Sequence, residues 1–119
     1  MERKSKIIRD EEAEHRPGEG LEVVVAVSKD NAGAPALWFG RFTTDPGVRI
    51  PPHYHTCDTA AYCIRGRAAF DIEGGRLEIS PGDFLYVPAG AVHTEETVGD
   101  ETAELIFARD EAGGETVFT

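Results

Sequence analysis

Two of the four histidines in this 119-residue sequence stand one residue apart, in the segment RIPPHYH that ends at His55. On an extended backbone, residues two apart point to the same side, so His53 and His55 project together with Cα atoms roughly 6.5–7 Å apart. That separation suits two imidazoles on one cation. Two ligands rarely make a protein metal site, and His93, which follows a Pro-Ala-Gly turn, offers a third. The alternative is that these histidines cap loops or satisfy core hydrogen bonds.

Three further side chains near the histidines, Cys57, Cys63 and Glu95, carry groups that can bind metals or transfer protons. Cys57 follows His55 by two residues and offers a soft ligand, although an ordinary loop thiol is the simpler interpretation. Cys63 belongs to a predicted strand, and we expect it in the core. Glu95 shares strand parity with His93, so it either orients a ligand or acts as a base within the cavity. The other interpretation of Glu95 is a surface glutamate at the rim of the fold.

Short segments rich in β-branched and apolar residues surround the histidines, and no helix is predicted. The expected strands are residues 21–28, 36–43, 58–65, 67–73, 76–80, 84–88, 93–98 and 102–109, with a short strand considered around Ile7 and Ile8. The breaks between them carry turn residues, such as the Gly74-Gly75 pair and Gly90. Many short strands at this spacing predict an all-β sandwich or barrel.

Together, the two histidine segments resemble the paired motifs of the cupin superfamily. The first motif combines a Gly, His-x-His, a Glu and a Gly, and the second combines a Gly, Pro-x-Gly, a His and an Asn. The matching residues are Gly47, His53, His55 and Gly66 in the first motif, and Gly82, Pro88, Gly90 and His93 in the second. The resemblance implies a double-stranded β-helix, or jelly-roll barrel, with a metal inside its mouth.

The sequence departs from the family pattern at two positions. Thr59 stands where the first motif has its glutamate, and Thr97 stands where the second motif ends in asparagine. Asp58 is the nearest carboxylate, but strand alternation turns it away from the face of Thr59 unless a bulge re-aims it. Three neutral imidazoles leave the charge of a dication uncompensated, which favours anionic ligands such as enolates. Such a site admits iron, zinc, nickel, manganese, cobalt or copper.

Composition limits the classes of partner. Twelve basic against 22 acidic residues give a net charge of −10, which disfavours nucleic acid and anionic membrane surfaces. No apolar run approaches the length of a membrane span, and the polar start lacks the apolar core of a signal peptide. A cytoplasmic location is the default expectation, in which Cys57 and Cys63 are thiols.

The domain expectation is a cupin barrel over residues 21–119, preceded by an N-terminal arm over residues 1–20. The arm is either loosely ordered or exchanged with a second subunit, and open sheet edges favour a homodimer. The resemblance implies a metal-binding cupin that acts on a small anionic or enolisable molecule, by dioxygenase-like or by polyketide-cyclase- or isomerase-like chemistry. The alternative is a non-catalytic small-molecule-binding or sensory module.

Overall fold

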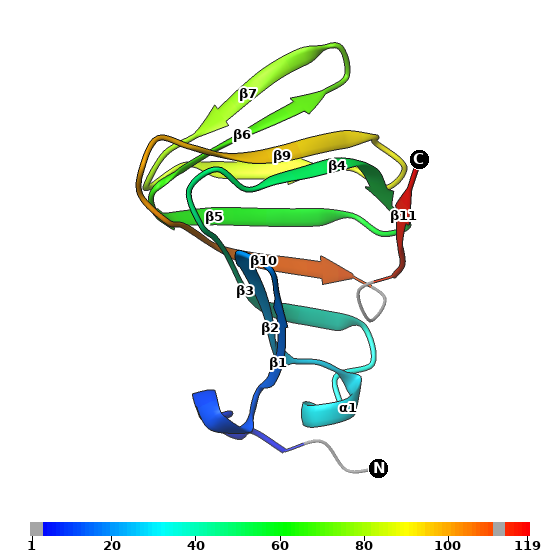
Figure 1. Cartoon of the computed structure of the whole chain (residues 1–119). Helices are drawn as coiled ribbons and strands as arrows, with labels where there is room; N and C mark the ends of the chain where they lie inside the picture. The colour runs from blue at the N-terminus through cyan, green and yellow to red at the C-terminus, as the bar shows by residue number, and fades with distance from the viewer. Residues whose placement is uncertain (1–3, 111–113) are drawn as a thin grey trace.

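Two antiparallel β-sheets make up the fold in a computed structural model that describes residues 4–110 and 114–119 (Figure 1). The larger sheet contains, in spatial order, β1 (Glu14–Gly18), β2 (Leu21–Val27), β3 (Leu37–Thr44), β10 (Ala103–Asp110), β5 (Thr59–Arg65) and β8 (Phe84–Val87). The smaller sheet contains β11 (Thr116–Phe118), β4 (Arg49–His55), β9 (His93–Val98), β6 (Arg67–Ile72) and β7 (Gly75–Ile79). This arrangement confirms the predicted all-β jelly-roll fold.

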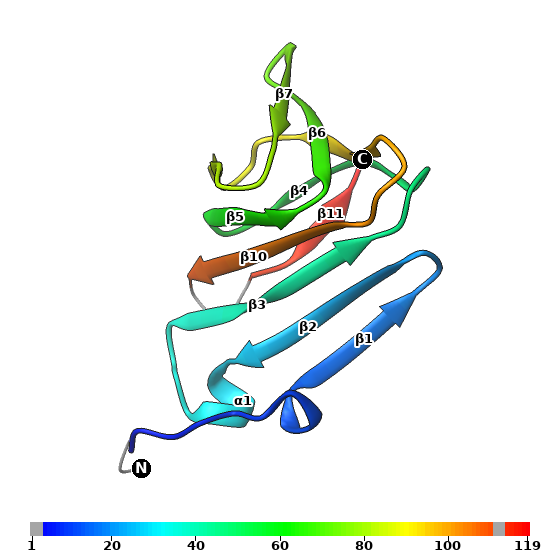
Figure 2. The ribbon, with the colours of Figure 1, turned by 90° about the vertical axis from the view of Figure 1, so that its left-hand side faces the viewer.

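The two sheets face each other over only part of their width. Figure 2 shows the smaller sheet opposite β5 and β10, whereas β1 and β2 extend the larger sheet beyond it. The interior of the barrel therefore lies between β4, β6 and β9 on one side and β3, β5 and β10 on the other. Alternation along each strand sends every second side chain into this interior.

The eight expected strands correspond to β2, β3 and β5 to β10. The suggested strand around Ile7 and Ile8 is wrong, because those residues lie outside any strand. A short helix, α1 (Lys29–Ala32), occupies part of a predicted turn, because Ser28 caps its start and Gly33 ends it in the left-handed conformation. The described residues include no helix long and apolar enough to cross a membrane.

The predicted arm over residues 1–20 contains a short 3₁₀ turn, η1 (Asp10–Glu12), and strand β1. Within this chain, β1 pairs with β2 from Glu14 opposite Val25 to Gly18 opposite Leu21. Residues 1–3 lie outside the described residues. Exchange of the arm with a second subunit and the homodimer itself stay predictions.

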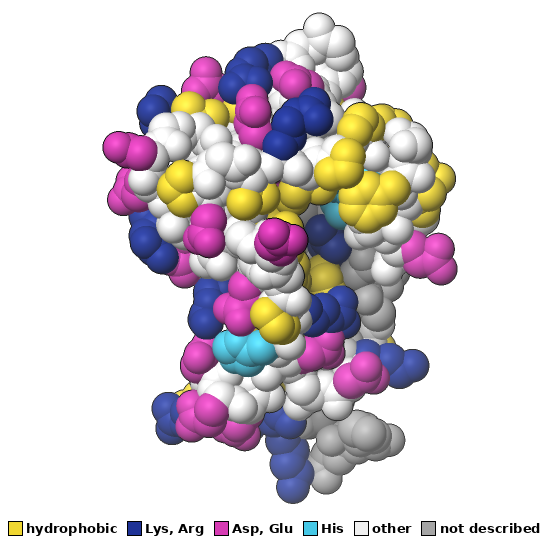
Figure 3. Space-filling view, viewed as in Figure 1, with side chains coloured by type: hydrophobic (Ala, Val, Ile, Leu, Met, Phe, Trp, Pro, Cys, Tyr) yellow, Lys and Arg dark blue, Asp and Glu magenta, His cyan; other side chains and the backbone are white. Residues whose placement is uncertain are grey.

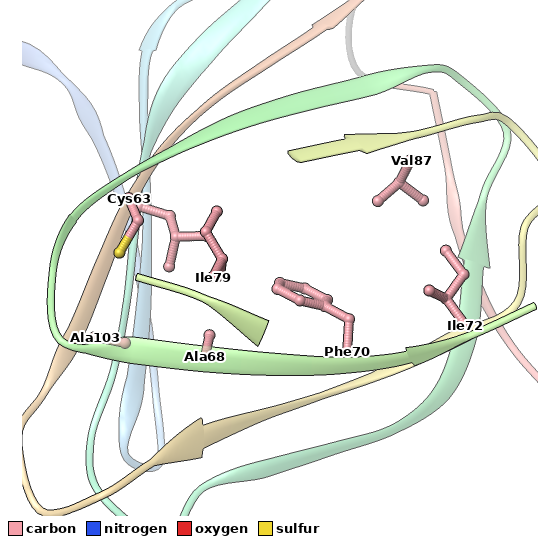
Figure 4. Packing of buried hydrophobic residues seen from close by; sticks show 8 residues of the cluster. Cys63, Ala68, Phe70, Ile72, Ile79, Val87 and Ala103 are labelled. Carbon is pink, nitrogen blue, oxygen red and sulfur yellow. The ribbon is translucent and has the colours of Figure 1, made fainter. Parts of the chain in front are cut away.

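A buried cluster at one end of the barrel holds the two sheets together. Cys63, Phe70, Ile72, Ile79 and Val87 come from four strands, β5 to β8, and their side chains converge (Figure 4). Burying side chains of this size contributes roughly 1.5–3 kcal/mol each. The expectation that Cys63 is a core residue is confirmed, since it is fully buried.

The sharp connection from β5 to β6 requires the glycine of the first motif. Gly66 has a φ of 69°, and a Cβ atom there would overlap the backbone carbonyl of Thr102. Only glycine adopts this conformation without strain while allowing the close backbone approach. The turn brings β6 back beneath β5, and so positions β9, which pairs with β6, in the opposite sheet.

Candidate metal centre

His53, His55 and His93 form one buried cluster inside the barrel. His53 and His55 alternate inward at the end of β4, and His93 starts β9 directly opposite His53. The ring centroids are 5.1 Å apart for His53 and His55, 4.3 Å for His53 and His93, and 5.3 Å for His55 and His93. One potential ligand atom from each ring lies within 4.8 Å of the others. The structure thus brings together the three histidines that the sequence singled out.

Irregular pairing on β4 places the first of these ligands. The register between β4 and β9 shifts between Ile50 and His53, and the two residues in between are Pro51 and Pro52. Proline has no backbone N–H for a sheet ladder, so this segment bulges away from regular pairing. The carbonyl of Pro51 is left free to bond the His53 ring.

Each of the three imidazoles is oriented through its Nδ1 atom. Nδ1 of His53 donates to the Pro51 carbonyl at 2.8 Å, and Nδ1 of His93 donates to the Ala91 carbonyl at 2.9 Å. Nδ1 of His55 lies 3.0 Å from the Thr116 hydroxyl. A carbonyl only accepts, so in His53 and His93 the proton is on Nδ1 and Nε2 carries the lone pair. This tautomer is the one that a metal bound through Nε2 requires.

The surroundings of His53 and His55 favour the neutral form of their rings. Burial lowers the pKa of His53, and burial together with the nearby Arg109 cation lowers the pKa of His55 to about 3. A neutral imidazole is the form that ligates a metal. The donor set, three buried and pre-oriented nitrogens without a carboxylate, fits a divalent transition metal of the imidazole-binding kind.

The turn between β8 and β9 is tied to the first motif by two hydrogen bonds. Gly90, with a φ of 83°, donates its N–H to the His55 carbonyl at 2.9 Å. The exposed Asp58 carboxylate accepts the N–H of Ala89 at 2.8 Å. Asp58 thus supports the turn that leads into His93. In the described part of the chain, the candidate metal-binding group of three histidines includes neither Asp58 nor Cys57.

Of the remaining candidate residues, Thr59 and Glu95 line the cavity, whereas Cys57 is not among its lining residues. Thr59 lines the cavity beside the histidines. Cys57 is buried, and burial raises the pKa of its thiol, which disfavours the thiolate form that binds metals. Glu95 also lines the cavity, on the face of His93. Burial raises the pKa of Glu95 to about 7, and its Oε2 atom has no hydrogen-bond partner among the described residues.

Sequence reasoning missed Arg109, which lies at the end of β10. Its Nη2 atom is 3.4 Å from Nε2 of His55, and its guanidinium stacks over the rings of Trp38 at 4.8 Å and Phe107 at 5.3 Å. The alternation along β10 could have identified it. Leu105 and Phe107 point into the cavity, and Arg109, two residues further along the strand, points to the same side. A charged residue at an inward position of a strand is unusual and indicates a function.

A cavity of about 290 Å³ connects these groups. Most of the wall is aromatic and aliphatic, including Phe42, Phe70, Leu85, Leu105 and Phe107. The polar part of the lining consists of the three histidines, Glu95, Arg16, Arg109, Thr59 and Thr116. The space-filling view shows a hollow in one face of the molecule where basic, histidine and hydrophobic side chains lie together (Figure 3). The fourth histidine, His15, lies outside the cavity lining.

Several known proteins share sequence with this chain. The cupin-domain family Cupin_2 matches residues 40–109. A quercetin 2,3-dioxygenase of Bacillus subtilis is 43% identical over 49 residues, which are 40% of this chain and 14% of that protein. The polyketide synthase protein CurC of Streptomyces cyaneus is 26% identical over 103 residues, covering 86% of this chain and 67% of that protein. The chain therefore spans a small part of the dioxygenase and about two thirds of CurC.

Solved structures share the fold. An oxalate decarboxylase of Bacillus subtilis superposes with a TM-score of 0.80 and 24% identity over 92% of this chain and 31% of that chain. KdgF from Halomonas sp. superposes with a TM-score of 0.72 and 19% identity over 89% of this chain and 94% of that chain. The family match covers both histidine segments and the strands between them. With two facing sheets and a buried three-histidine cluster, the chain belongs to the cupin family.

Proposed function

We propose that His53, His55 and His93 hold one divalent transition metal, and that the cavity beside it binds and transforms a small anionic or enolisable molecule. The observation that carries this proposal is the convergence of three buried rings, two of which, His53 and His93, are oriented through Nδ1 so that Nε2 carries the lone pair. The ion would be iron, zinc, nickel, manganese, cobalt or copper, since imidazoles bind all of these.

The charge in the cavity supports an anionic ligand. Imidazole binds a metal in its neutral form, so three such ligands would leave the charge of a dication uncompensated, and Arg109 adds a further positive charge next to His55. When bound, the metal supplies a Lewis acid that stabilises the oxygen of an enolate or phenolate. The apolar wall excludes water from that oxygen, which strengthens the electrostatic attraction.

The relatives support two kinds of chemistry. Two of them, the quercetin 2,3-dioxygenase and a gentisate 1,2-dioxygenase of a Ralstonia species, are named as dioxygenases. Two others, CurC and TcmJ, are named as polyketide synthase proteins. The fold neighbour oxalate decarboxylase has Mn(II) centres. A dioxygenase-like reaction and a cyclase- or isomerase-like reaction are therefore both compatible with the proposed site.

A non-catalytic binding module is the second candidate. It is favoured by Glu95 and Arg109, whose buried polar atoms without partners would bind a ligand whether or not it reacts. In that case the metal would bind the ligand without promoting any reaction.

The test begins with protein purified without oxygen, analysed for metals and reloaded separately with each candidate ion. Acetylacetone, which enolises readily, and catechol serve as probes, with oxygen uptake and ultraviolet absorbance as readouts. Because either probe changes its absorbance simply by binding the metal, only a change that continues over many turnovers counts as a reaction. Oxygen uptake with the iron form identifies a dioxygenase, and a continuing absorbance change without oxygen uptake identifies a cyclase or isomerase. His53→Ala should abolish either signal, whereas His15→Ala should retain it. Metal-dependent binding without any reaction would contradict catalysis and establish the binding module.

A further inference from the structure

Acidic and basic side chains line the same cavity from opposite sheets, and of the basic ones Arg16 is exposed and paired with Glu14, whereas Arg109 lies deeper beside His55. Glu95 comes from β9 in the smaller sheet, and Arg109 comes from β10 in the larger sheet. Glu95 is only 8% exposed, and its Oε2 atom has no hydrogen-bond partner among the described residues. The same holds for the buried Nε atom of Arg109. Leaving such atoms without partners costs roughly 1–3 kcal/mol each, and more for charged groups.

The two groups do not satisfy each other. The ion pairs formed by residues 4–110 and 114–119 do not include one between Glu95 and Arg109. The guanidinium lies against the rings of Trp38 and Phe107, which also pack against each other with centroids 5.1 Å apart. The cavity therefore presents a buried carboxyl oxygen from one sheet and a guanidinium from the other.

The shape and polarity of that space limit what fills it. Its volume of about 290 Å³ is at the lower end of the range for pockets that bind organic ligands. Most of the side chains that line the cavity besides Glu95 and Arg109 are aromatic or aliphatic, among them Phe42, Leu85 and Leu105. A molecule with one ring and two polar ends matches this wall, whereas water alone would leave most of it without favourable contacts.

We propose that the cavity selects an organic carboxylate that also carries a hydroxyl group on a body the size of a single ring. Arg109 binds the carboxylate, because a guanidinium forms paired hydrogen bonds with two oxygens. Glu95 accepts the hydrogen bond of the hydroxyl group. The inference deepens the proposed function, on which it rests for the metal, because Arg109 holds the carboxylate next to His55 and hence next to the metal position.

Calorimetric titration of the zinc-loaded and the metal-free protein tests this selection separately from catalysis. The probes are 2-, 3- and 4-hydroxybenzoate, benzoate, which lacks the hydroxyl group, and 3-hydroxybenzamide, which lacks the charge. At least one hydroxybenzoate should bind about tenfold to a hundredfold more tightly than both benzoate and the amide, as expected for hydrogen bonds that involve a charged group. Equal affinity of the wild-type protein for all probes, or no binding, would overturn the proposal without any variant.

Two variants then assign the roles. Arg109→Gln should remove the preference for 3-hydroxybenzoate over 3-hydroxybenzamide, and Glu95→Met should remove the preference for hydroxybenzoate over benzoate. Arg65→Gln and Glu96→Gln are the matched controls, because both side chains form ion pairs outside the cavity lining. Retained preferences in Arg109→Gln and Glu95→Met would overturn the assignment.

The ligand selectivity of the cavity and the catalytic proposal can fail separately. Probe selectivity in the metal-free protein, combined with no reaction in any metal-loaded form, would support the ligand assignment and refute the catalytic proposal. Turnover of acetylacetone in a protein that shows no preference among the benzoate probes would do the reverse.

Discussion

The guanidinium of Arg109 lies beside the ring of His55, with Nη2 3.4 Å from Nε2. In the tautomer that suits metal binding, this Nε2 atom carries the ligating lone pair. A cation bound there would have a second, permanent positive charge as its neighbour. In the proposed metal site, Arg109 would therefore weaken the binding of the metal and strengthen the binding of an anion that contacts both positive charges.

Arg109→Gln should accordingly increase the affinity of the metal-free protein for zinc. Removing a unit charge next to a dication in a partly buried site relieves repulsion, and we expect at least about a tenfold gain. Competition against a chromogenic zinc chelator measures the change. Arg65→Gln, which removes a charge outside the cavity, should leave the affinity unchanged. An unchanged or weaker affinity in Arg109→Gln would show that the guanidinium turns away from the bound metal.

Asp58→Ala should retain normal metal content. The carboxylate of Asp58 accepts the N–H of Ala89, and the metal-binding cluster found within the described residues does not contain it. The variant should lose about 1 kcal/mol of unfolding free energy, the usual contribution of one hydrogen bond. Urea denaturation and elemental analysis provide the two readouts. An empty site in Asp58→Ala would mean that the strand rearranges so that the carboxylate binds the metal.

Thr59→Glu should tighten zinc binding and weaken the binding of anionic ligands. Thr59 lines the cavity and pairs across the sheet with Arg109, so a carboxylate there would oppose both positive charges. Neutralising one unit of charge at the site strengthens the attraction for a dication. Chelator competition and calorimetric titration with benzoate measure the two effects. Thr59→Gln is the control, because glutamine matches glutamate in size but carries no charge. Equal zinc and benzoate affinities in the two variants would exclude the electrostatic explanation.

His15 should make a contribution to the stability of the folded protein that depends on pH. Its Nε2 atom lies 2.9 Å from the Asp10 carbonyl and its Nδ1 atom 3.4 Å from the Glu22 carboxylate. Both ring nitrogens face acceptors, which favours the protonated ring. The hydrogen bond to the Asp10 carbonyl raises the pKa of His15 above 6.5, and the bond to the Glu22 carboxylate is the second cause. The contribution is complete below the unfolded pKa and is lost as the pH rises through the higher folded pKa.

Thermal unfolding of the wild-type protein and His15→Gln at about pH 6 and about pH 9 tests this, on either side of the usual histidine range. The wild-type protein should exceed the variant in melting temperature at the lower pH, and the difference should shrink at the higher pH. A difference that grows with pH would contradict the assigned direction.

Much of the fold was predictable from the sequence because turn residues and alternating apolar residues mark most strands. The expected strands 93–98 and 67–73, for example, correspond closely to β9 and β6. Strand β1 was not predicted because its sequence, EHRPG, is polar and contains a proline. Its pairing with the strongly β-forming β2 determines its conformation, and such tertiary contacts do not appear in the local sequence.

The candidate site was predictable to the extent that it follows from spacing. His53 and His55 share a face because they are two residues apart, and the Pro-Ala-Gly turn brings His93 beside them. Arg109 was not found, because its proximity to His55 depends on the facing of two sheets, which connects residues 54 positions apart. Likewise, the role of Asp58 in the turn depends on a contact with Ala89 across 31 residues.

Metal content per chain is the most direct measurement of the central claim that His53, His55 and His93 form a metal site. The wild-type protein, His93→Ala and His15→Ala should each be incubated with excess zinc, desalted and analysed by inductively coupled plasma mass spectrometry. We predict one zinc ion per chain for the wild-type protein and for His15→Ala, and a large loss for His93→Ala, because a ligand is missing from a site that has three. Equal zinc content in His93→Ala and His15→Ala would contradict the account.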